Sequence, residues 1–166
     1  MTENFKQKLN RIRAFVFDID GVLTDGKITF HADNTTSRSL NAKDGYALQR
    51  ALRAGFFVAV ISYAKDEVLR ERLKNIGLTE VYLGSTDKEE TLKEFAAVYS
   101  LGYDEIAFMG DDVPDILAMK RCGIAACPYD AAPDIREISI YISPKKGGEG
   151  CVRDIIEQAL RLSGKW

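Results

Sequence analysis

The sequence predicts an α/β fold with three layers, in which a parallel β-sheet lies between helices on both of its faces. The main observation is that short, β-rich apolar runs alternate with amphipathic segments of helix length, as in successive βαβ units. The 166 residues, 46% hydrophobic and 29% charged, suit a single globular domain spanning residues 1–166. No repeat and no linker interrupts the pattern, so we expect one Rossmann-like sheet.

Six short apolar runs are predicted to form the strands of this sheet. In chain order they are Ala14–Phe17, Phe57–Ile61, Val81–Leu83, Ile106–Met109, Ile124–Ala126 and Ser139–Ile142. Five amphipathic segments are predicted to form helices. They are Tyr46–Ala54, Asp66–Ile76, Lys88–Tyr99, Val113–Arg121 and Val152–Leu162. Gly55 and Gly77 directly follow the first two helices, where a left-handed glycine is expected to end each helix.

The segment Lys27–Leu40 departs from this alternation. Residues 28–31 alternate in polarity, residues 32–35 are turn formers, and residues 36–40 return in the opposite direction. We therefore predict a β-hairpin insertion after the first strand, projecting from the top of the sheet.

The charge and hydropathy of the chain exclude several classes of partner. The 23 Lys and Arg against 25 Asp and Glu give a net charge of −2, which provides no positive field for nucleic acid or anionic lipid. Apolar stretches such as Phe56–Ile61 are far shorter than the ~18 residues of a membrane span, and Met1–Asn10 is too polar for a signal peptide. We expect a soluble, cytoplasmic protein that binds neither nucleic acid nor membrane.

The cysteine and histidine content narrows the chemistry. Cys122, Cys127 and Cys151 lack CxxC spacing and are an odd number, so we expect core residues rather than disulfides or a structural zinc site. Only one histidine, His31, is present, which leaves no multi-histidine metal cluster. Catalysis must use carboxylates, hydroxyls and lysines unless His31 itself takes part.

Acidic, hydroxyl and amino side chains follow the predicted strands. Asp18 and Asp20 follow the first strand, Ser62 the second, and Gly110–Asp115 the fourth, while Lys88 begins the third helix. Ligands of open α/β sheets bind at the carboxyl ends of the strands, so these groups are expected to converge. Crowded carboxylates without histidine favour a hard cation such as Mg²⁺, and the neutralised pocket can accept a phosphate dianion.

These residues, at the ends of three strands and at the start of one helix, form four motifs in a fixed order. With these motifs, the sequence resembles the haloacid dehalogenase-like phosphohydrolase superfamily over nearly the whole chain. The matching motifs are Asp18-Ile19-Asp20-Gly21-Val22-Leu23-Thr24, then Ser62, Lys88 and Gly110-Asp111-Asp112-Val113-Pro114-Asp115. The resemblance implies that Asp18 is a nucleophile that forms an aspartyl-phosphate and that Asp20 is the general acid and base. It further implies that Ser62 and Lys88 hold the phosphoryl group.

The same resemblance implies a Mg²⁺ site. Its ligands would be Asp18, the main-chain carbonyl of Asp20, and Asp111, with Asp112 and Asp115 in supporting roles. The division suits phosphoester hydrolysis, because a carboxylate nucleophile splits the reaction into two displacements while the cation offsets developing charge.

The stretch between Asp18 and Ser62 holds only the hairpin and one helix, so no cap domain fits and neighbouring subunits must wall the site. This arrangement resembles the capless subgroup of 3-deoxy-D-manno-octulosonate 8-phosphate phosphatases, which are tetramers. Residues 147–153 also resemble the Gly-rich tail of that subgroup. We therefore expect a homotetramer built around the Lys27–Leu40 hairpins, with Lys145–Arg153 near the active site of the next subunit.

The subgroup implies further substrate contacts and a role in lipopolysaccharide biosynthesis. The contacts beyond Asp20, Ser62 and Lys88 are Asn41, Lys43, Asp44, Gly45 and Arg72. Two positions depart from the pattern: Ala64 replaces an Arg or Glu, and Gln49 replaces an arginine. The predicted substrate is 3-deoxy-D-manno-octulosonate 8-phosphate, and a nine-carbon sialic-acid-type 9-phosphate is the alternative.

A phospho-accepting regulatory module is an alternative from another class, because receiver domains also combine an acidic Mg²⁺ pocket with a hydroxyl and a lysine. A receiver has adjacent acids after its first strand and its lysine late in the chain. Here Asp20 lies two residues beyond Asp18, and Lys88 precedes Asp111. The order of residues therefore favours the phosphatase.

Overall fold

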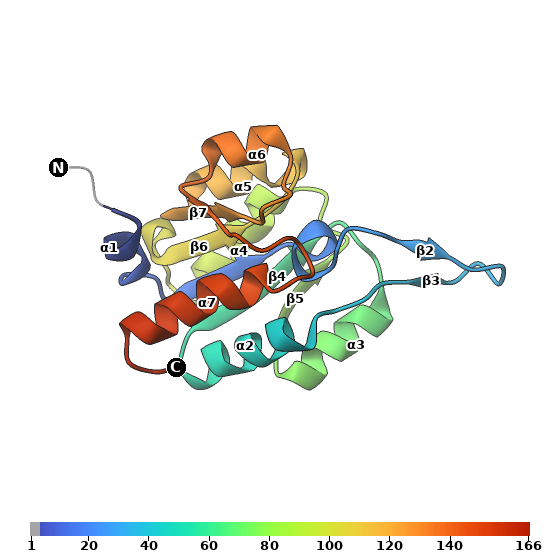
Figure 1. Ribbon diagram of the computed structural model, residues 1–166, viewed down its shortest axis with the longest axis horizontal. Coiled ribbons are helices and arrows are strands. Elements are labelled where there is room, and N and C mark those ends of the chain that lie inside the picture. The colour runs from blue at the N-terminus through green and yellow to red at the C-terminus, as the bar shows by residue number, and fades with distance from the viewer. Residues whose placement is uncertain (1–3) are drawn as a thin grey trace.

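The computed structural model describes residues 4–166, so the first three residues of the Met1–Asn10 segment lie outside it. Six strands form a parallel sheet in the order β5-β4-β1-β6-β7-β8 (Figure 1). They are β1 (Ala14–Phe17), β4 (Phe57–Ser62), β5 (Glu80–Leu83), β6 (Ile106–Met109), β7 (Ile124–Cys127) and β8 (Tyr141–Ile142). The predicted α/β class and parallel sheet are confirmed.

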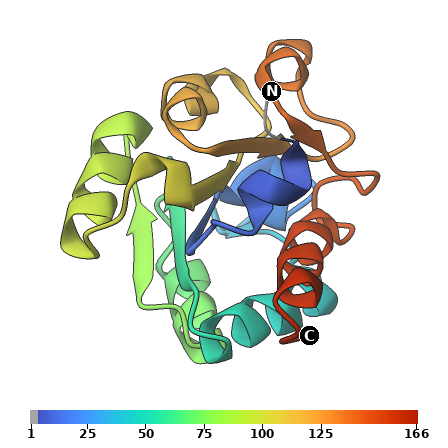
Figure 2. The same ribbon diagram turned by 90° about the vertical axis from the view of Figure 1, so that its left-hand side faces the viewer.

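Helices cover both faces of this sheet (Figure 2). They are α1 (Phe5–Leu9), α2 (Ala42–Arg53), α3 (Glu67–Ile76), α4 (Lys88–Val98), α5 (Ile116–Arg121), α6 (Pro133–Ile138) and α7 (Cys151–Leu162). The central strand β1 shows how the two cores form, since alternate side chains of a strand point to opposite faces. Phe15 and Phe17 pack in the core with α2, α3 and α7, whereas Ala14 and Val16 pack in the core with α4, α5 and α6.

All six predicted strands are present, and the predicted helices differ mainly at their beginnings. Helix α2 begins at Ala42, four residues before the predicted Tyr46, because the Asn41 side chain caps it by accepting from the Lys43 N–H at 2.9 Å. The predicted helix 113–121 is divided into a 3₁₀ turn, Val113–Asp115, and α5.

The sequence analysis missed α1 and α6, which have five and six residues. Each buries one side chain, Leu9 and Ile135 respectively, which is too little for an amphipathic period. The predicted glycine endings are confirmed, since Gly55 and Gly77 have φ of 91° and 107°.

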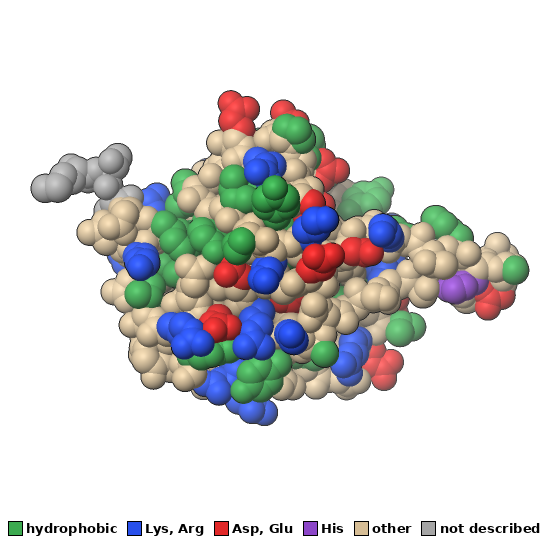
Figure 3. Space-filling view, in the orientation of Figure 1, with side chains coloured by type: hydrophobic (Ala, Val, Ile, Leu, Met, Phe, Trp, Pro, Cys, Tyr) green, Lys and Arg blue, Asp and Glu red, His purple; other side chains and the backbone are tan. Residues whose placement is uncertain are grey.

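The predicted hairpin is present and extends away from the body of the molecule (Figures 1 and 3). Strands β2 (Thr29–Phe30) and β3 (Thr36–Ser37) pair in antiparallel fashion. Phe30 is 80% exposed and Ile28 37% exposed, so this ribbon leaves apolar side chains uncovered in the single chain.

The three cysteines are free thiols, and Cys127 and Cys151 are buried as predicted, whereas Cys122 is half-buried. Among residues 4–166, no helix combines the length and apolar character needed to cross a membrane.

Candidate active site

Four elements bring the predicted catalytic residues together. Asp18 directly follows β1, Ser62 ends β4, and Asp111 lies just beyond β6. Because β1 lies between β4 and β6 in the sheet, the carboxyl ends of these three parallel strands are adjacent. Lys88 enters the same region from the first position of α4. The predicted convergence of these groups is observed.

Lys88 lies between two buried carboxylates. Its Nζ is 3.0 Å from Oδ2 of Asp18 and donates to Oδ1 of Asp115 at 2.6 Å. The three side chains are 5%, 11% and 1% exposed, respectively. Burial lowers the pKa of Lys88, but the adjacent Asp18 and Asp115 outweigh this, and the net effect raises its pKa. The ammonium is therefore a fixed positive charge at the carboxyl end of the sheet.

Asp18, Asp111 and Asp115 each present a carboxylate oxygen, and these oxygens lie within 4.8 Å of one another. Burial, with the neighbouring Asp115, raises the pKa of Asp18 to about 6. Burial, with the neighbouring Asp18, raises the pKa of Asp111 to about 8. Three crowded carboxylates balanced by one ammonium fit a divalent cation with oxygen ligands, which would supply the missing positive charge.

The loop after β1 is held in a tight turn, Ile19–Leu23. Oδ1 of Asp18 accepts from the Ile19 N–H at 2.7 Å, and Gly21 has φ of 89°. A β-carbon at Gly21 would collide with the carboxylate of Asp111, so only glycine fits where this turn approaches β6.

Asp115 organises the loop after β6. Its Oδ2 accepts from the N–H of Asp111 at 3.0 Å and from the N–H of Asp112 at 3.4 Å. The Asp112 side chain in turn caps the next turn by accepting from the Val113 N–H at 2.8 Å. These contacts orient Asp111, and they are consistent with the supporting roles expected for Asp112 and Asp115.

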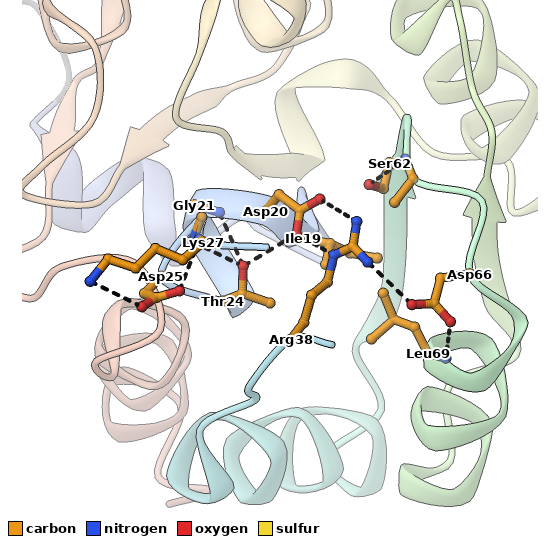
Figure 4. A network of polar contacts seen from close by, with 12 residues as sticks. Ile19, Asp20, Gly21, Thr24, Asp25, Lys27, Arg38, Ser62, Asp66 and Leu69 are labelled. Carbon is orange, nitrogen blue, oxygen red and sulfur yellow. Dashed lines mark hydrogen bonds and ion pairs between the residues drawn. The ribbon is translucent and has the colours of Figure 1, made fainter. Parts of the chain in front are cut away.

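Asp20 lies on the same turn, with its carboxylate in an ion pair that the sequence analysis missed (Figure 4). Arg38, which follows β3 of the hairpin, places Nε 2.8 Å from Oδ1 and Nη2 3.2 Å from Oδ2 of Asp20. Its Nη1 donates to Asp66, the N-cap of α3, at 3.2 Å. No signal in the sequence distinguishes Arg38 from an exposed hairpin charge, because only the folded hairpin brings it beside Asp20.

A cavity of about 470 Å³ opens beside Arg38, between the end of the hairpin, α2 and α3. Three of the residues predicted to bind substrate line it: Asn41, Gly45 and Arg72. Gln49, at one of the two positions that depart from the subgroup, also lines it.

Lys43 and Asp44 do not line this cavity. Lys43 is exposed and lines a second cavity of about 390 Å³ together with Arg153. Asp44 is buried and accepts from the Arg153 N–H at 2.8 Å, in the first turn of α7. Asn41, Gly45 and Gln49 are spaced four residues apart and share one face of the helix, whereas Lys43 and Asp44 lie between them in sequence and therefore on other faces of α2.

The glycine-rich tail packs against the active-site turn of its own chain. The Gly148 N–H donates to the Val22 carbonyl at 2.9 Å, and Asn41 donates to the Gly148 carbonyl at 3.0 Å. A β-carbon at Gly147 would collide with the Gly21 carbonyl. The close approach of the tail to the active-site turn within one chain is therefore sufficient to explain why residues 147 and 148 are glycines.

Comparison with known proteins agrees with this geometry. No family model matches the chain. The 3-deoxy-D-manno-octulosonate 8-phosphate phosphatase KdsC of Escherichia coli K12 is 29% identical over 158 residues, which are 95% of this chain and 84% of that protein. The solved structure of a protein described as a probable YrbI family phosphatase from Pseudomonas syringae pv. phaseolica 1448a is 34% identical, with a TM-score of 0.93 and coverage of 96% and 91%.

A third relative was solved with ligands. The 3-deoxy-D-manno-octulosonate 8-phosphate phosphatase of Moraxella catarrhalis, in complex with a magnesium ion, a phosphate ion and a KDO molecule, is 29% identical, with a TM-score of 0.91 and coverage of 95% and 90%. The parallel sheet carries aspartates, Lys88 and Ser62 at the carboxyl ends of its strands, and the similar proteins are phosphatases. The chain therefore belongs to the haloacid dehalogenase-like phosphohydrolase superfamily. Within that class it is a phosphoric monoester hydrolase, and it is similar to the YrbI family and KdsC phosphatases named above.

Proposed function

We propose that this enzyme is a Mg²⁺-dependent phosphatase that hydrolyses 3-deoxy-D-manno-octulosonate 8-phosphate through an aspartyl-phosphate on Asp18. The observation that carries the proposal is the position of Asp18, which lies beside Lys88 and the carboxylates of Asp111 and Asp115. A cavity lined by Arg38 and Arg72 adjoins the site, since Arg38 also pairs with Asp20. The names of the relatives from Escherichia coli and Moraxella catarrhalis support the substrate.

In the first displacement, a carboxylate oxygen of Asp18 attacks phosphorus and the ester oxygen departs. Asp20 gives its proton to the departing oxygen, so the sugar acid leaves as a neutral alcohol at that position. Lys88 and the Ser62 hydroxyl hold the phosphoryl oxygens during transfer. Ser62 is 2% exposed at the end of β4, and its Oγ is fixed by the Ala64 N–H at 3.2 Å.

In the second displacement, water attacks the phosphorus of the aspartyl-phosphate and gives a proton to Asp20. Inorganic phosphate leaves, and the Asp18 carboxylate is restored. The Ile19 N–H and Lys88 hold the two oxygens of Asp18 and thereby fix the direction of attack.

The residues that would hold Mg²⁺ are Asp18, the main-chain carbonyl of Asp20, and Asp111, with Asp112 and Asp115 in support. When bound, the cation neutralises the carboxylates and the phosphoryl oxygens, so that the anionic substrate and the anionic nucleophile can approach each other. The three crowded carboxylates and the magnesium in the Moraxella catarrhalis relative support this assignment.

The proposed assembly is a homotetramer formed through the hairpins. Phe30 and Ile28 have no cover in the single chain, and an isolated two-stranded ribbon is only marginally stable in water. The segment Lys145–Arg153 would then lie near a neighbouring active site while it also contacts its own.

The test is turnover by the purified protein on a panel of phosphate esters, with Mg²⁺ and with EDTA. We expect kcat/KM for 3-deoxy-D-manno-octulosonate 8-phosphate to exceed that for hexose phosphates by at least about tenfold, a preference within reach of a few specific polar contacts. Equal efficiency on hexose phosphates would refute the substrate and leave the phosphatase intact. Preference for a nine-carbon 9-phosphate would select the second candidate, a sialic-acid-type substrate.

A further inference from the structure

Arg38 lies between Asp20, the proposed acid–base residue, and the cavity of about 470 Å³. Its side chain is 10% exposed and bridges Asp20 and Asp66 (Figure 4). The guanidinium uses Nε and Nη2 on the two oxygens of Asp20 and Nη1 on Asp66. All three nitrogens are therefore engaged by carboxylates of the same chain.

This contact restricts what Asp20 can do. Its Oδ1 also accepts from the Thr24 hydroxyl at 3.3 Å, so both of its oxygens face partners within the chain. To pass a proton to a departing ester oxygen, one oxygen of Asp20 must face the substrate instead. A substrate oxygen that approaches Asp20 competes with the Arg38 guanidinium for these oxygens, so we expect at least one of the two Arg38 contacts to weaken during catalysis.

A carboxylate bound in the cavity would attract the Arg38 guanidinium away from Asp20. Arg38 and Arg72 both line it, and among the described residues that line it none is acidic. Within residues 4–166, Arg72 makes no ion pair with any carboxylate. A planar carboxylate in this cavity would meet two guanidinium groups, and guanidinium binds carboxylate through paired hydrogen bonds.

We propose that Arg38 is a specificity-determining positioning residue: a carboxylate on the leaving part of the substrate takes over its donors, which anchors the substrate and frees Asp20. Asp66 keeps the guanidinium at the N-terminus of α3 while the exchange occurs, because it caps that helix independently by accepting from the Leu69 N–H at 3.2 Å. A substrate without the carboxylate leaves Arg38 on Asp20. This rests on the proposed function for the identity of the acid–base residue.

The test compares phosphate esters that differ in a carboxylate. One pair is 3-deoxy-D-manno-octulosonate 8-phosphate and arabinose 5-phosphate, and a second, smaller pair is 3-phosphoglycerate and glycerol 1-phosphate. The variants are Arg38→Gln and, as a matched control, Arg161→Gln, which loses an exposed ion pair with Glu157 near the C-terminal end of α7. All are assayed with Mg²⁺ for kcat and KM separately.

We expect Arg38→Gln to lower kcat/KM about 10- to 100-fold on the carboxylate substrates, the size of a lost charge-assisted contact, with an increase in KM. On the substrates without carboxylate we expect no loss or a gain, because Asp20 is released. The ratio of kcat/KM for the carboxylate ester to kcat/KM for its partner without carboxylate is therefore expected to fall in Arg38→Gln and to stay unchanged in Arg161→Gln. Asp66→Asn keeps the helix cap and is expected to weaken the preference by a smaller factor.

An equal loss on both members of each pair would overturn the inference, since it would mean that Arg38 serves only to hold the fold or Asp20. An unchanged preference would also overturn it. Should Arg38→Gln not fold, Arg38→Lys retains a charge without the guanidinium fork and carries the same expectations. If the wild type does not hydrolyse the octulosonate ester, the proposed substrate fails, whereas the three-carbon pair still tests the role of Arg38.

Discussion

Replacing Lys88 with methionine tests whether this side chain holds the buried carboxylates together. The substitution keeps most of the length and the apolar stem and removes the charge. At an effective dielectric constant of about 20, the separations of 3.0 Å and 2.6 Å correspond to attractions of about 5 to 6 kcal/mol for each ion pair. The cost of desolvating the charges offsets much of this attraction, and removing one partner of a buried pair typically costs about 3–5 kcal/mol.

We therefore expect Lys88→Met to lose about 3–5 kcal/mol of unfolding free energy in EDTA. For a protein of this size the loss corresponds to a melting temperature lower by roughly 6–20 °C. Added Mg²⁺ should restore more stability in the variant than in the wild type, because it neutralises Asp18 and Asp111 without competition from the ammonium. Phosphatase activity should still fall by about 10²–10³, as when a preorganised donor to a reacting oxygen is lost.

Thermal and urea unfolding, each with EDTA and with Mg²⁺, provide the measurement. The matched control is Lys93→Met on the same helix, where an exposed ion pair with Glu90 is lost at a cost of less than about 1 kcal/mol. An unfolding free energy for Lys88→Met within about 1 kcal/mol of the wild type in EDTA would refute the reasoning. The same Mg²⁺ increment in both proteins would refute it as well.

Other substitutions test the remaining roles. Asp18→Asn should abolish turnover, because the amide is neither an anionic nucleophile nor a strong metal ligand; near wild-type kcat would exclude the mechanism. Asp20→Asn should slow turnover of alkyl esters by about 10²–10⁴ and 4-nitrophenyl phosphate much less, since nitrophenolate departs without a proton; an equal loss on both would contradict the acid role. Burial raises the pKa of Asp44 from 3.8 to about 6, so the folded state retains a proton that the unfolded state releases, and the unfolding free energy should fall by about 3 kcal/mol as pH rises across that interval. Urea unfolding of Asp44→Asn in Mg²⁺ should show a flatter pH dependence, and an unchanged slope would count against this. Phe30→Ser should shift the sedimentation of the assembly toward smaller species; wild-type sedimentation of this variant would argue against assembly through the hairpin.

The sequence alone determined the strands and the residues that follow them. Buried parallel strands are apolar throughout, so Ala14–Phe17 and Ile106–Met109 were predicted with their observed bounds. Asp18 and Ser62 could be placed at the same sheet edge because each is fixed by the end of its own strand. Local sequence is sufficient where the position of a side chain depends on one element and on the rule that parallel strands share a direction.

Only the tertiary structure decided contacts that join distant segments. Arg38 meets Asp20 and Asp66 because the hairpin returns across the first turn and toward α3, and no local pattern specifies that path. Asp44 is buried against α7 rather than facing the cavity, because it lies on the face of α2 that packs on the rest of the fold, where it accepts from the Arg153 N–H. A helix rotates by about 100° per residue, so the way it packs on the sheet and on its neighbouring helices decides whether a polar side chain lies in a cavity or in a core.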